Sequence, residues 1–415
     1  MGGWCMSEID PKILERHNRL PRRLGIIYER IDDPASILKY GRNPKLAAAL
    51  YRKRITVDDI PFEEHGGFLD WKHHRPGDYE KKIPRLGANN IKEIVGVRKL
   101  LDGFNNYDPE SDDPLSGGAV AIETKHGITC SFGYSKRGTK DELKAFSLAK
   151  ELEVNDPNLV LAYLVSEETS PFDSFGGVGG VNFKVPMEVA QAKNRMDDRG
   201  FRELLGSTRG YEKGVVEEFL KKQTAKMRLF TFKEHGNFPY EILDMDGVAM
   251  ISEQATPNVE IAYEDLSFPM EKPNEEIIAL LMMSGKVVAR VPSNGIGLGD
   301  GRVEDGMVTR FDGYGFGSST ARYKGCQQAV DNMTDPAVLE CPNLILSALR
   351  KKPKRVVGAS DGFFPWWDNI KILADGGVEY MLVCAGGMKK RQEMVLKVAE
   401  ENGLELVYYH GRLFW

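Results

Sequence analysis

The chain has 415 residues, 41% of them hydrophobic and 28% charged, which is typical of a globular protein with two or three domains or two similar halves. The formal net charge is −5, and the absence of any long block of like charge argues against a nucleic-acid-binding arm. No run approaches the roughly 20 apolar residues of a membrane span. The five cysteines are scattered and the N-terminal residues do not form a secretory signal, so we expect a cytoplasmic protein without disulfides or zinc.

Apolar periodicity and turn residues predict the elements in chain order. After a polar, basic arm or short helix over 1–24, helices are predicted over residues 45–54, 91–101, 139–152, 186–195, 212–226, 274–284, 318–332, 370–374 and 389–402. Strands are predicted over residues 119–122, 159–165, 227–232, 246–254, 286–290, 356–359, 380–384 and 404–409. The composition of residues 55–85 predicts a solvated loop. Glycine-rich turns are predicted over residues 295–301 and 313–317. The alternation predicts an α/β fold with helices on both faces of mainly parallel sheets.

The strand over 119–122 leads directly to Lys125 and His126, which are followed by Gly127. Neighbouring residues of a strand point to opposite faces, so the two side chains reach one ligand only if the strand breaks there. Gly127 permits such a break because glycine adopts backbone angles that other residues avoid. An ordinary surface pair at a turn explains the same spacing.

Two further segments have the residue types of anion sites. The glycine-rich stretch at 170–180 follows a predicted strand, and Ser318 to Arg322 begin a predicted helix, whose N-terminal N–H groups suit a phosphate. The first segment matches neither Gly-x-Gly-x-x-Gly nor a P-loop. A tight packing turn is an equally good interpretation of the first.

Seven short motifs occur in one order along residues 36–415. They are Leu-Lys-Tyr-Gly-Arg-Asn-Pro at 38–44, Asn-Asn at 89–90, Lys-His at 125–126, Asp-Ser-Phe-Gly-Gly at 173–177, Pro-Ser-Asn at 292–294, Ser-Asp-Gly-Phe-Phe-Pro-x-x-Asp-Asn at 360–369 and Arg-Leu-Phe at 412–414. In this order the motifs resemble the transformylase part of the purine-pathway enzyme that formylates aminoimidazole carboxamide ribonucleotide (AICAR). The resemblance extends over nearly the whole chain.

The resemblance implies a fold of two cytidine-deaminase-like α/β/α halves. With the arm at 1–24, we expect the halves at 25–215 and 216–415. It also implies a homodimer with active sites at the subunit interface. The cyclohydrolase domain that usually precedes the transformylase is not among the 415 residues, so a stand-alone transformylase and a separate IMP cyclohydrolase are expected.

The implied activity is formyl transfer from 10-formyltetrahydrofolate to the 5-amino group of AICAR, the penultimate step of IMP synthesis, with no metal. Transfer to so weak a nucleophile needs a base, oxyanion stabilisation and positioning of both ligands. The resemblance makes His126 the general base and Lys125 the residue that stabilises the oxyanion or protonates the folate nitrogen. It makes Asn294 the residue that holds the carboxamide or the formyl oxygen.

Further residues are expected to bind substrate. The candidate phosphate contacts are Lys39, Tyr40, Arg322 and Arg412. Phe364 and Pro365 suit the wall of a pocket for a flat heterocycle, with Asp368 as its polar anchor, although core packing beneath a turn is the plain alternative. The remaining binding residues implied by the motifs are Gly41, Asn90, Ser174, Phe175 and Gly176.

The sequence departs from the family pattern where Gly-Gln-x-Ser-Arg is usual, because Gly317-Ser-Ser-Thr-Ala-Arg322 stands there instead. The acceptor is therefore AICAR or, alternatively, a modified aminoimidazole or another nucleotide. A catalytically silent nucleotide-binding relative is the alternative from a different class. Zinc-dependent deamination is excluded, because the chain has neither His/Cys-x-Glu nor Pro-Cys-x-x-Cys.

Overall fold

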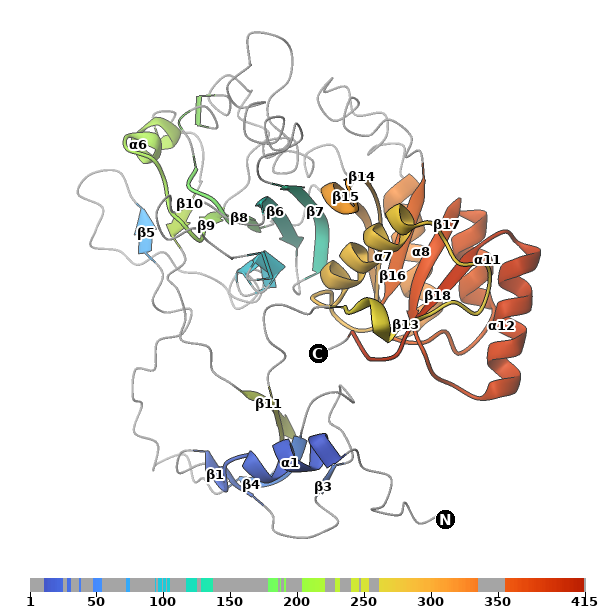
Figure 1. Cartoon of the computed structure of the whole chain (residues 1–415). Helices are drawn as coiled ribbons and strands as arrows, with labels where there is room; N and C mark the ends of the chain where they lie inside the picture. Colours follow the sequence, from blue (N-terminus) through green and yellow to red (C-terminus); the bar gives the residue numbers. More distant parts are fainter. Residues whose placement is uncertain are drawn as a thin grey trace. The chain divides into compact units, whose positions relative to one another are not determined.

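The computed structural model of the chain (Figure 1) describes residues 11–24, 28–30, 37–38, 48–53, 72–74, 94, 96–98, 100–101, 103–104, 117–124, 128–136, 178–185, 187, 190–191, 204–220, 228–231, 240–245, 248–253, 261–334 and 355–413. Its contacts divide the chain into two units. The first takes in residues 1–67 and 235–256, and the second takes in 68–234 and 257–414.

The first unit consists of helix α1 (Pro11–Arg19) and a six-stranded antiparallel sheet. The strands are β1 (Arg23–Leu24), β2 (Tyr28–Arg30), β3 (Ile37–Leu38), β4 (Ala48–Lys53), β11 (Tyr240–Met245) and β12 (Val248–Glu253). Residues Ala49, Tyr51, Ala249 and Ile251 pack together in its core. His17 of α1 is buried, and its Nδ1 lies 3.0 Å from the Ala48 carbonyl oxygen.

The predicted helix over 45–54 is wrong, because β4 occupies Ala48–Lys53. The alanine-rich sequence favours a helix locally, but β4 pairs along one side with β12 and along the other with β2 and β3. Pairing on both sides, together with the burial of Ala49 and Tyr51, overrides the weak local preference.

The second unit is built on a twelve-stranded sheet in the order β13-β18-β17-β16-β14-β15-β7-β6-β8-β9-β10-β5. The strands of its N-terminal part are β5 (Lys72–His74), β6 (Gly117–Thr124), β7 (Ile128–Lys136), β8 (Val178–Val181), β9 (Leu204–Ser207) and β10 (Arg228–Thr231). Those of its C-terminal part are β13 (Leu266–Ser267), β14 (Gly295–Glu304), β15 (Met307–Ser318), β16 (Val356–Ser360), β17 (Val378–Cys384) and β18 (Glu405–Tyr409).

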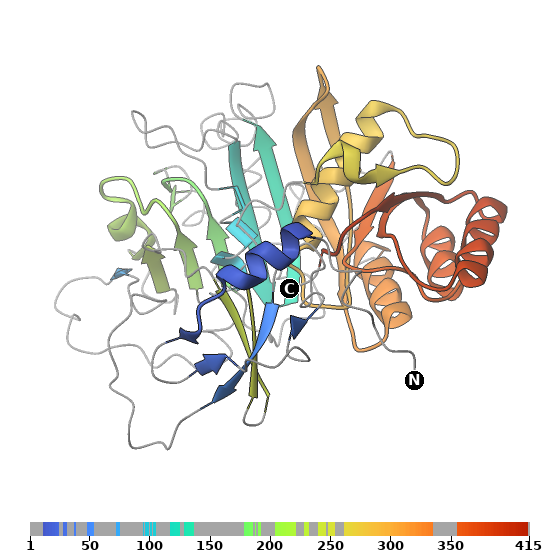
Figure 2. The ribbon, with the colours of Figure 1, turned by 60° about the horizontal axis from the view of Figure 1, so that its bottom comes forward.

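On both sides of the centre of this sheet, parallel and antiparallel strand pairs follow one another in the same order. Outward from the antiparallel β15–β7 pair at the centre, which Figure 2 shows as orange and teal strands, each side runs antiparallel, antiparallel, parallel, parallel, antiparallel. The predicted division of the chain into two halves stays a prediction. The boundaries of those halves and their likeness to cytidine deaminases stay predictions.

Helices cover both faces of the C-terminal part of the sheet. Helix α7 (Glu275–Val288) lies on one face, and α8 (Arg322–Thr334), α11 (Asp368–Asp375) and α12 (Lys389–Glu401) lie on the other. Strand β17 shows why, because Leu382 and Cys384 pack in the core under α7 while Met381 and Val383 pack under the other helices. This is the two-residue alternation of a strand buried on both faces.

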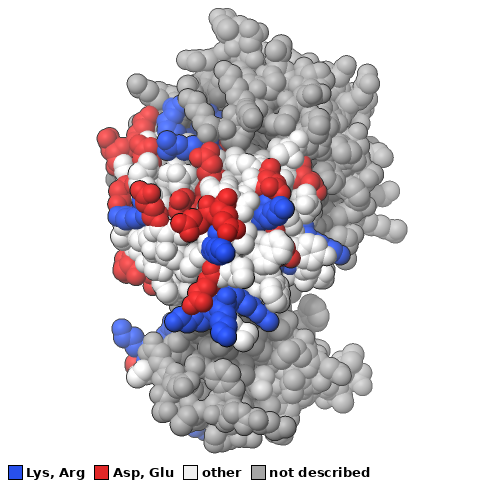
Figure 3. All heavy atoms as spheres, turned by 90° about the vertical axis from the view of Figure 1, so that its right-hand side faces the viewer, with Lys and Arg blue, Asp and Glu red and all other residues white. Residues whose placement is uncertain are grey.

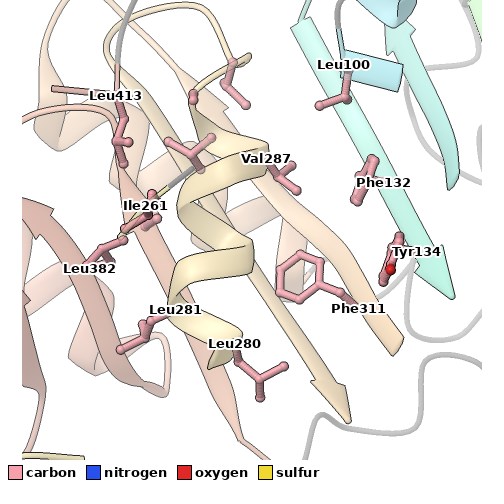
Figure 4. Close-up of a cluster of buried hydrophobic side chains, with 14 of the residues drawn as sticks. Leu100, Phe132, Tyr134, Ile261, Leu280, Leu281, Val287, Phe311, Leu382 and Leu413 are labelled. Carbon is pink, nitrogen blue, oxygen red and sulfur yellow. The ribbon is translucent and has the colours of Figure 1, made fainter. Parts of the chain in front are cut away.

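The core under α7 extends across the centre of the sheet (Figure 4). Leu280, Leu281 and Val287 point from α7 towards the sheet, and Phe132 and Tyr134 of β7 lie beside Phe311 of β15. The N-terminal and C-terminal parts of the sheet therefore share a hydrophobic core.

Four further predictions about elements are wrong. The solvated loop predicted over 55–85 contains strand β5 (Lys72–His74), which pairs with β10. The strand over 286–290 does not form, because α7 continues to Val288 and a turn follows. The glycine-rich stretches at 295–301 and 313–317 are parts of β14 and β15. The sheet is also mixed rather than mainly parallel, since four of its eleven described pairings are parallel.

The glycines of β14 and β15 allow close packing rather than turns. A Cβ atom at Gly297 would lie 2.5 Å from Val288 of α7, and one at Gly317 would lie 1.9 Å from the Gly325 carbonyl oxygen of α8. The missing side chains let helices approach both faces of this hairpin.

Many other predicted elements are confirmed. The strands near 119–122, 227–232, 246–254, 356–359, 380–384 and 404–409 all form, as do α7, α8, α11, α12 and, in its shorter form, α6 (Val215–Leu220). Residues 94, 96–98 and 100–101 are helical, as are residues 187 and 190–191. The helix predicted over 139–152 and the strand over 159–165 lie outside the described residues.

The surface of the described part carries both signs of charge. Figure 3 shows acidic and basic side chains together on one face of the molecule. Among the helices that the structure describes, none combines the length and the hydropathy needed to cross a membrane.

Candidate functional site

One edge of the twelve-stranded sheet gathers the ends of strands that carry predicted site residues; we call it the site edge. Strand β14 begins there, because its Gly295 pairs with Ser318 at the end of β15 and its Ile296 pairs with Ser360 at the end of β16. Strands β17 and β18 run parallel to β16, so they also end at this edge.

The same edge continues into the N-terminal part of the sheet. Strand β7 is antiparallel to β15, so its start at Ile128 lies at the edge where β15 ends. Thr124 at the end of β6 pairs with Ile128, and Val178 at the start of β8 pairs with Glu123. Three strand ends from this part of the sheet therefore join those from the other part.

Arg322, the first residue of α8, lies at the centre of a polar cluster at the site edge. Its guanidinium donates to Ser360 Oγ at 2.8 Å and to Asn294 Oδ1 at 2.7 Å, and it also pairs with Asp361 Oδ1. The Arg322 side chain is 11% exposed and that of Asp361 is fully buried. Sequence segments far apart in the chain meet here because β14 lies between β15 and β16.

The Asn294 side chain is held on both of its polar atoms. Nδ2 donates to the carbonyl oxygens of Ser319 at 3.0 Å and Thr320 at 3.2 Å, while Oδ1 accepts from Arg322. The backbone N–H of Asn294 also donates to the Ser319 carbonyl oxygen, at 3.2 Å. The Nδ2 hydrogens are thus used within the chain, and the remaining hydrogen-bonding capacity of the amide is on Oδ1.

Asp361 is enclosed by backbone on several sides. Its N–H donates to the Gly295 carbonyl oxygen at 3.0 Å, and its carbonyl oxygen accepts from Leu413 N at 3.1 Å and from Cys384 Sγ at 3.2 Å. Burial raises the pKa of the Cys384 thiol to about 11, so the thiol stays protonated. Carboxylate oxygen Oδ2 of Asp361 is buried and has no hydrogen-bond partner among the described residues.

The segment after Asp361 leads from the site edge into the core. Phe364 is 1% exposed and packs with the hydrophobic residues under α8 and α11, while Pro365 is half-buried. Asp368 Oδ1 accepts from the Asn369 backbone N–H at 2.9 Å. The predicted pocket-wall and anchor roles of these residues stay predictions, and the burial of Phe364 agrees with the packing alternative.

Arg412 follows β18 and lies at the site edge. Its guanidinium donates to the Ala385 carbonyl oxygen at 3.0 Å, and its carbon Cζ lies 5.1 Å from the centre of the Phe363 ring. Gly386 permits this approach, since a Cβ atom there would lie 2.9 Å from the guanidinium. The predicted phosphate contact of Arg412 stays a prediction.

The other predicted site residues lie outside the described residues. They are Lys39, Tyr40, Gly41, Asn90, Lys125, His126, Ser174, Phe175 and Gly176. Of the residues that are described, Asn294 and Arg322 contact each other directly.

Sequence reasoning assigned no role to Ser360 and Asp361, although both belong to a matching motif. The signal available was a Ser-Asp pair directly after a buried strand, at a position where polar groups meet at a sheet edge. Across the described ranges, no three His, Cys, Asp or Glu side chains gather in a way that would hold a metal ion.

The described geometry can be set beside known proteins. A family model described as AICARFT/IMPCHase bienzyme matches residues 12–332. The chain is 24% identical over 388 residues to the bifunctional purine biosynthesis protein PurH of Pelodictyon phaeoclathratiforme, covering 91% of this chain and 58% of that protein. It is 22% identical over 406 residues to PurH of Thermoanaerobacter sp., covering 97% and 62% respectively.

The PurH protein of Halalkalibacterium halodurans is also 22% identical, over 395 residues that cover 95% of this chain and 61% of the relative. The chain thus spans roughly three fifths of the length of the curated relatives it matches. The family model matches well over half of the 415 residues. The chain belongs to the AICARFT/IMPCHase bienzyme family.

Proposed function

We propose that the chain transfers the formyl group of 10-formyltetrahydrofolate to the 5-amino group of AICAR, giving formyl-AICAR. Family membership supports this activity, and one structural observation carries it. Asn294, Arg322 and Arg412 lie at the site edge, and the motifs at 125–126 and 173–177 directly adjoin the described strand ends at Thr124 and Val178. Motifs scattered over the sequence thus contain, or directly adjoin in the sequence, strand ends at one edge of one sheet.

The chemistry assigned to each residue follows from its functional group. His126 serves as the general base for the amine proton, because the unperturbed pKa of histidine, about 6.5, is near the operating pH. Lys125 stabilises the developing oxyanion or protonates the departing folate nitrogen. Since the Nδ2 hydrogens of Asn294 are used within the chain, its free acceptor capacity on Oδ1 suits an N–H of the substrate carboxamide better than the formyl oxygen.

The remaining parts of the proposal concern binding and assembly. Arg412 with Lys39 and Tyr40 would contact the nucleotide phosphate, and Gly41, Asn90, Ser174, Phe175 and Gly176 would line the site. The protein acts in the cytoplasm as a homodimer, and a separate cyclohydrolase closes the purine ring.

The decisive experiment follows tetrahydrofolate release with AICAR and 10-formyltetrahydrofolate, in the wild type and in His126→Ala and Lys125→Met. Lys397→Met is the matched control, because this exposed lysine of α12 is paired only with Glu401 among the contacts described. Turnover by the wild type that is lost in both variants and kept in the control supports the proposal.

The alternatives give different results in the same assay. AICAR binding without turnover identifies a silent nucleotide-binding relative, and neither binding nor turnover points to a different acceptor. Ring closure of formyl-AICAR is measured in the same reaction. The 5-amino group of AICAR is a weak nucleophile, so formyl transfer should be nearly reversible and should stop near equilibrium unless a cyclohydrolase consumes the product. Steady conversion to the cyclised purine by the purified chain alone would contradict the separate cyclohydrolase.

A further inference from the structure

The ion pair between Arg322 and Asp361 is largely buried at the site edge. Asp361 is 0% exposed, and Ser360 Oγ accepts a second hydrogen bond from the same guanidinium nitrogen that pairs with Asp361. Gly362 makes room for the pair, because a Cβ atom there would lie 2.6 Å from the guanidinium. The end of β16 is thus shaped around Arg322.

This pairing changes what Arg322 can do. A buried carboxylate in direct contact compensates the guanidinium charge, so Arg322 offers N–H donors but little net positive charge. A phosphate dianion needs uncompensated cations. Because of this ion pair, Arg322 is better suited to binding a neutral group than a phosphate. The neutral group that it contacts is the side-chain amide of Asn294, whose Oδ1 accepts its hydrogen bond.

Within the described ranges, the three partners of the Asn294 side chain come from one short segment. The carbonyls of Ser319 and Thr320 and the guanidinium of Arg322 surround the amide. This segment joins β15 to α8, and the Arg322 contacts with Ser360 and Asp361 fix its end to β16. Loss of the Asp361 charge would loosen the whole segment that orients the amide.

We propose that Asp361 is a positioning residue of the formyl-transfer site, which acts through Arg322 to orient the Asn294 amide towards the substrate. This inference rests on the proposed function. Under this inference, Asp361 affects the rate of formyl transfer. Arg322 positions Asn294, in place of the phosphate contact predicted from the sequence.

The first test is Asp361→Asn, which keeps the shape of the side chain and removes its charge. We expect kcat to fall about 10- to 100-fold, because displacement of a reacting group by about 1 Å is enough for such a loss. The KM for AICAR should change less than about threefold, since the phosphate contacts are elsewhere. A rise in KM with kcat unchanged would overturn the proposal and return Arg322 to the phosphate.

The second test is a double-mutant cycle with Asn294→Ala. If Asp361 acts through Asn294, adding Asp361→Asn to Asn294→Ala should lower kcat less than twofold further, because the two residues form one unit. Multiplicative losses would show that Asp361 acts on the site by another route, and would overturn the proposal.

Two further variants guard against misfolding. Arg322→Lys keeps the ion pair with Asp361 but loses the forked guanidinium that reaches Asn294, so it should fold and show the same loss of kcat. Asp375→Asn, an exposed position of α11, is the matched control and should keep wild-type kcat. Full activity in Arg322→Lys would contradict the positioning role, whereas a wild type without turnover would overturn the proposed function and with it this inference.

Discussion

Gly317→Ala tests the packing that brings Arg322 to the site edge. Gly317 lies in β15, and a Cβ atom there would lie 1.9 Å from the Gly325 carbonyl oxygen and 2.8 Å from Ala329 N, both on α8. These are backbone atoms, which cannot rotate away as a side chain can. Helix α8 would therefore have to move by about 1 Å or more before the contacts became tolerable.

The expected size of the effect follows from that displacement. Overpacking of a well-ordered core typically destabilises a protein by about 1–3 kcal/mol, sometimes more. The midpoint of thermal unfolding should fall by roughly 2–10 °C. Because α8 begins at Arg322, the same displacement should lower the rate of formyl transfer by up to about 100-fold.

The measurement is differential scanning fluorimetry together with the tetrahydrofolate-release assay. Gly306→Asn is the matched control, since Gly306 has a positive φ of 75°, which Asn tolerates. In the described part of the chain, no heavy atom beyond its two chain neighbours lies within 4 Å of its Cβ position. The control should unfold within about 2 °C of the wild type. A Gly317→Ala protein with unchanged unfolding midpoint and rate would show that α8 does not pack on β15 in this way.

Three further predictions concern burial. Phe364→Ala should lower the free energy of unfolding by about 3–5 kcal/mol and Trp366→Ala by about 1 kcal/mol or less, measured by urea denaturation, since Phe364 is 1% and Trp366 is 50% exposed. Burial lowers the pKa of His17 below 6.5, so the stability that neutral His17 contributes is present above about pH 6.5 and is lost as the pH falls through the folded-state pKa. The difference in unfolding midpoint between wild type and His17→Gln should therefore be larger at pH 7.5 than at pH 5.5, and an equal difference would contradict this. Burial raises the pKa of Cys326 and Cys384, so peptide mapping should find both unmodified by iodoacetamide at pH 8 until the protein is denatured.

The elements predicted correctly from the sequence are those with a clear apolar pattern within their own residues. Helix α7 and strand β17 are examples, because the apolar residues of α7 recur at helical spacing and β17 ends in a continuous apolar run. Strand β4 was missed since its alanines favour a helix and only its pairing partners make it a strand. Strands β14 and β15 were missed because their glycines indicate turns locally, whereas the packing of helices against both faces requires them.

The sequence allowed us to single out candidate site residues by their type, but not to predict which of their side chains contact one another. Asn294 stood out as a polar residue in a matching motif and Arg322 as the arginine nearest to a family motif that the chain does not match. Nothing in the sequence states that β14 lies between β15 and β16. Without that order, the carboxylate of Asp361 could not be recognised as the partner of Arg322. Strand order depends on contacts between distant segments, which a single sequence does not encode in any local pattern.

The same strand order explains how Arg322 reaches the site edge although residues 317–322 depart from the pattern expected for the family. The arginine is displaced by one position in the sequence, yet Arg322 contacts Asn294 directly and is fixed by Ser360 and Asp361. Replacing a buried ion pair by well-packed apolar residues is often neutral or stabilising, so stability alone gives little reason for the Arg322–Asp361 pair at this position. The proposed formyl transfer gives this pair a role, and the turnover assay with His126→Ala and Asp361→Asn decides between a working transferase and a silent relative.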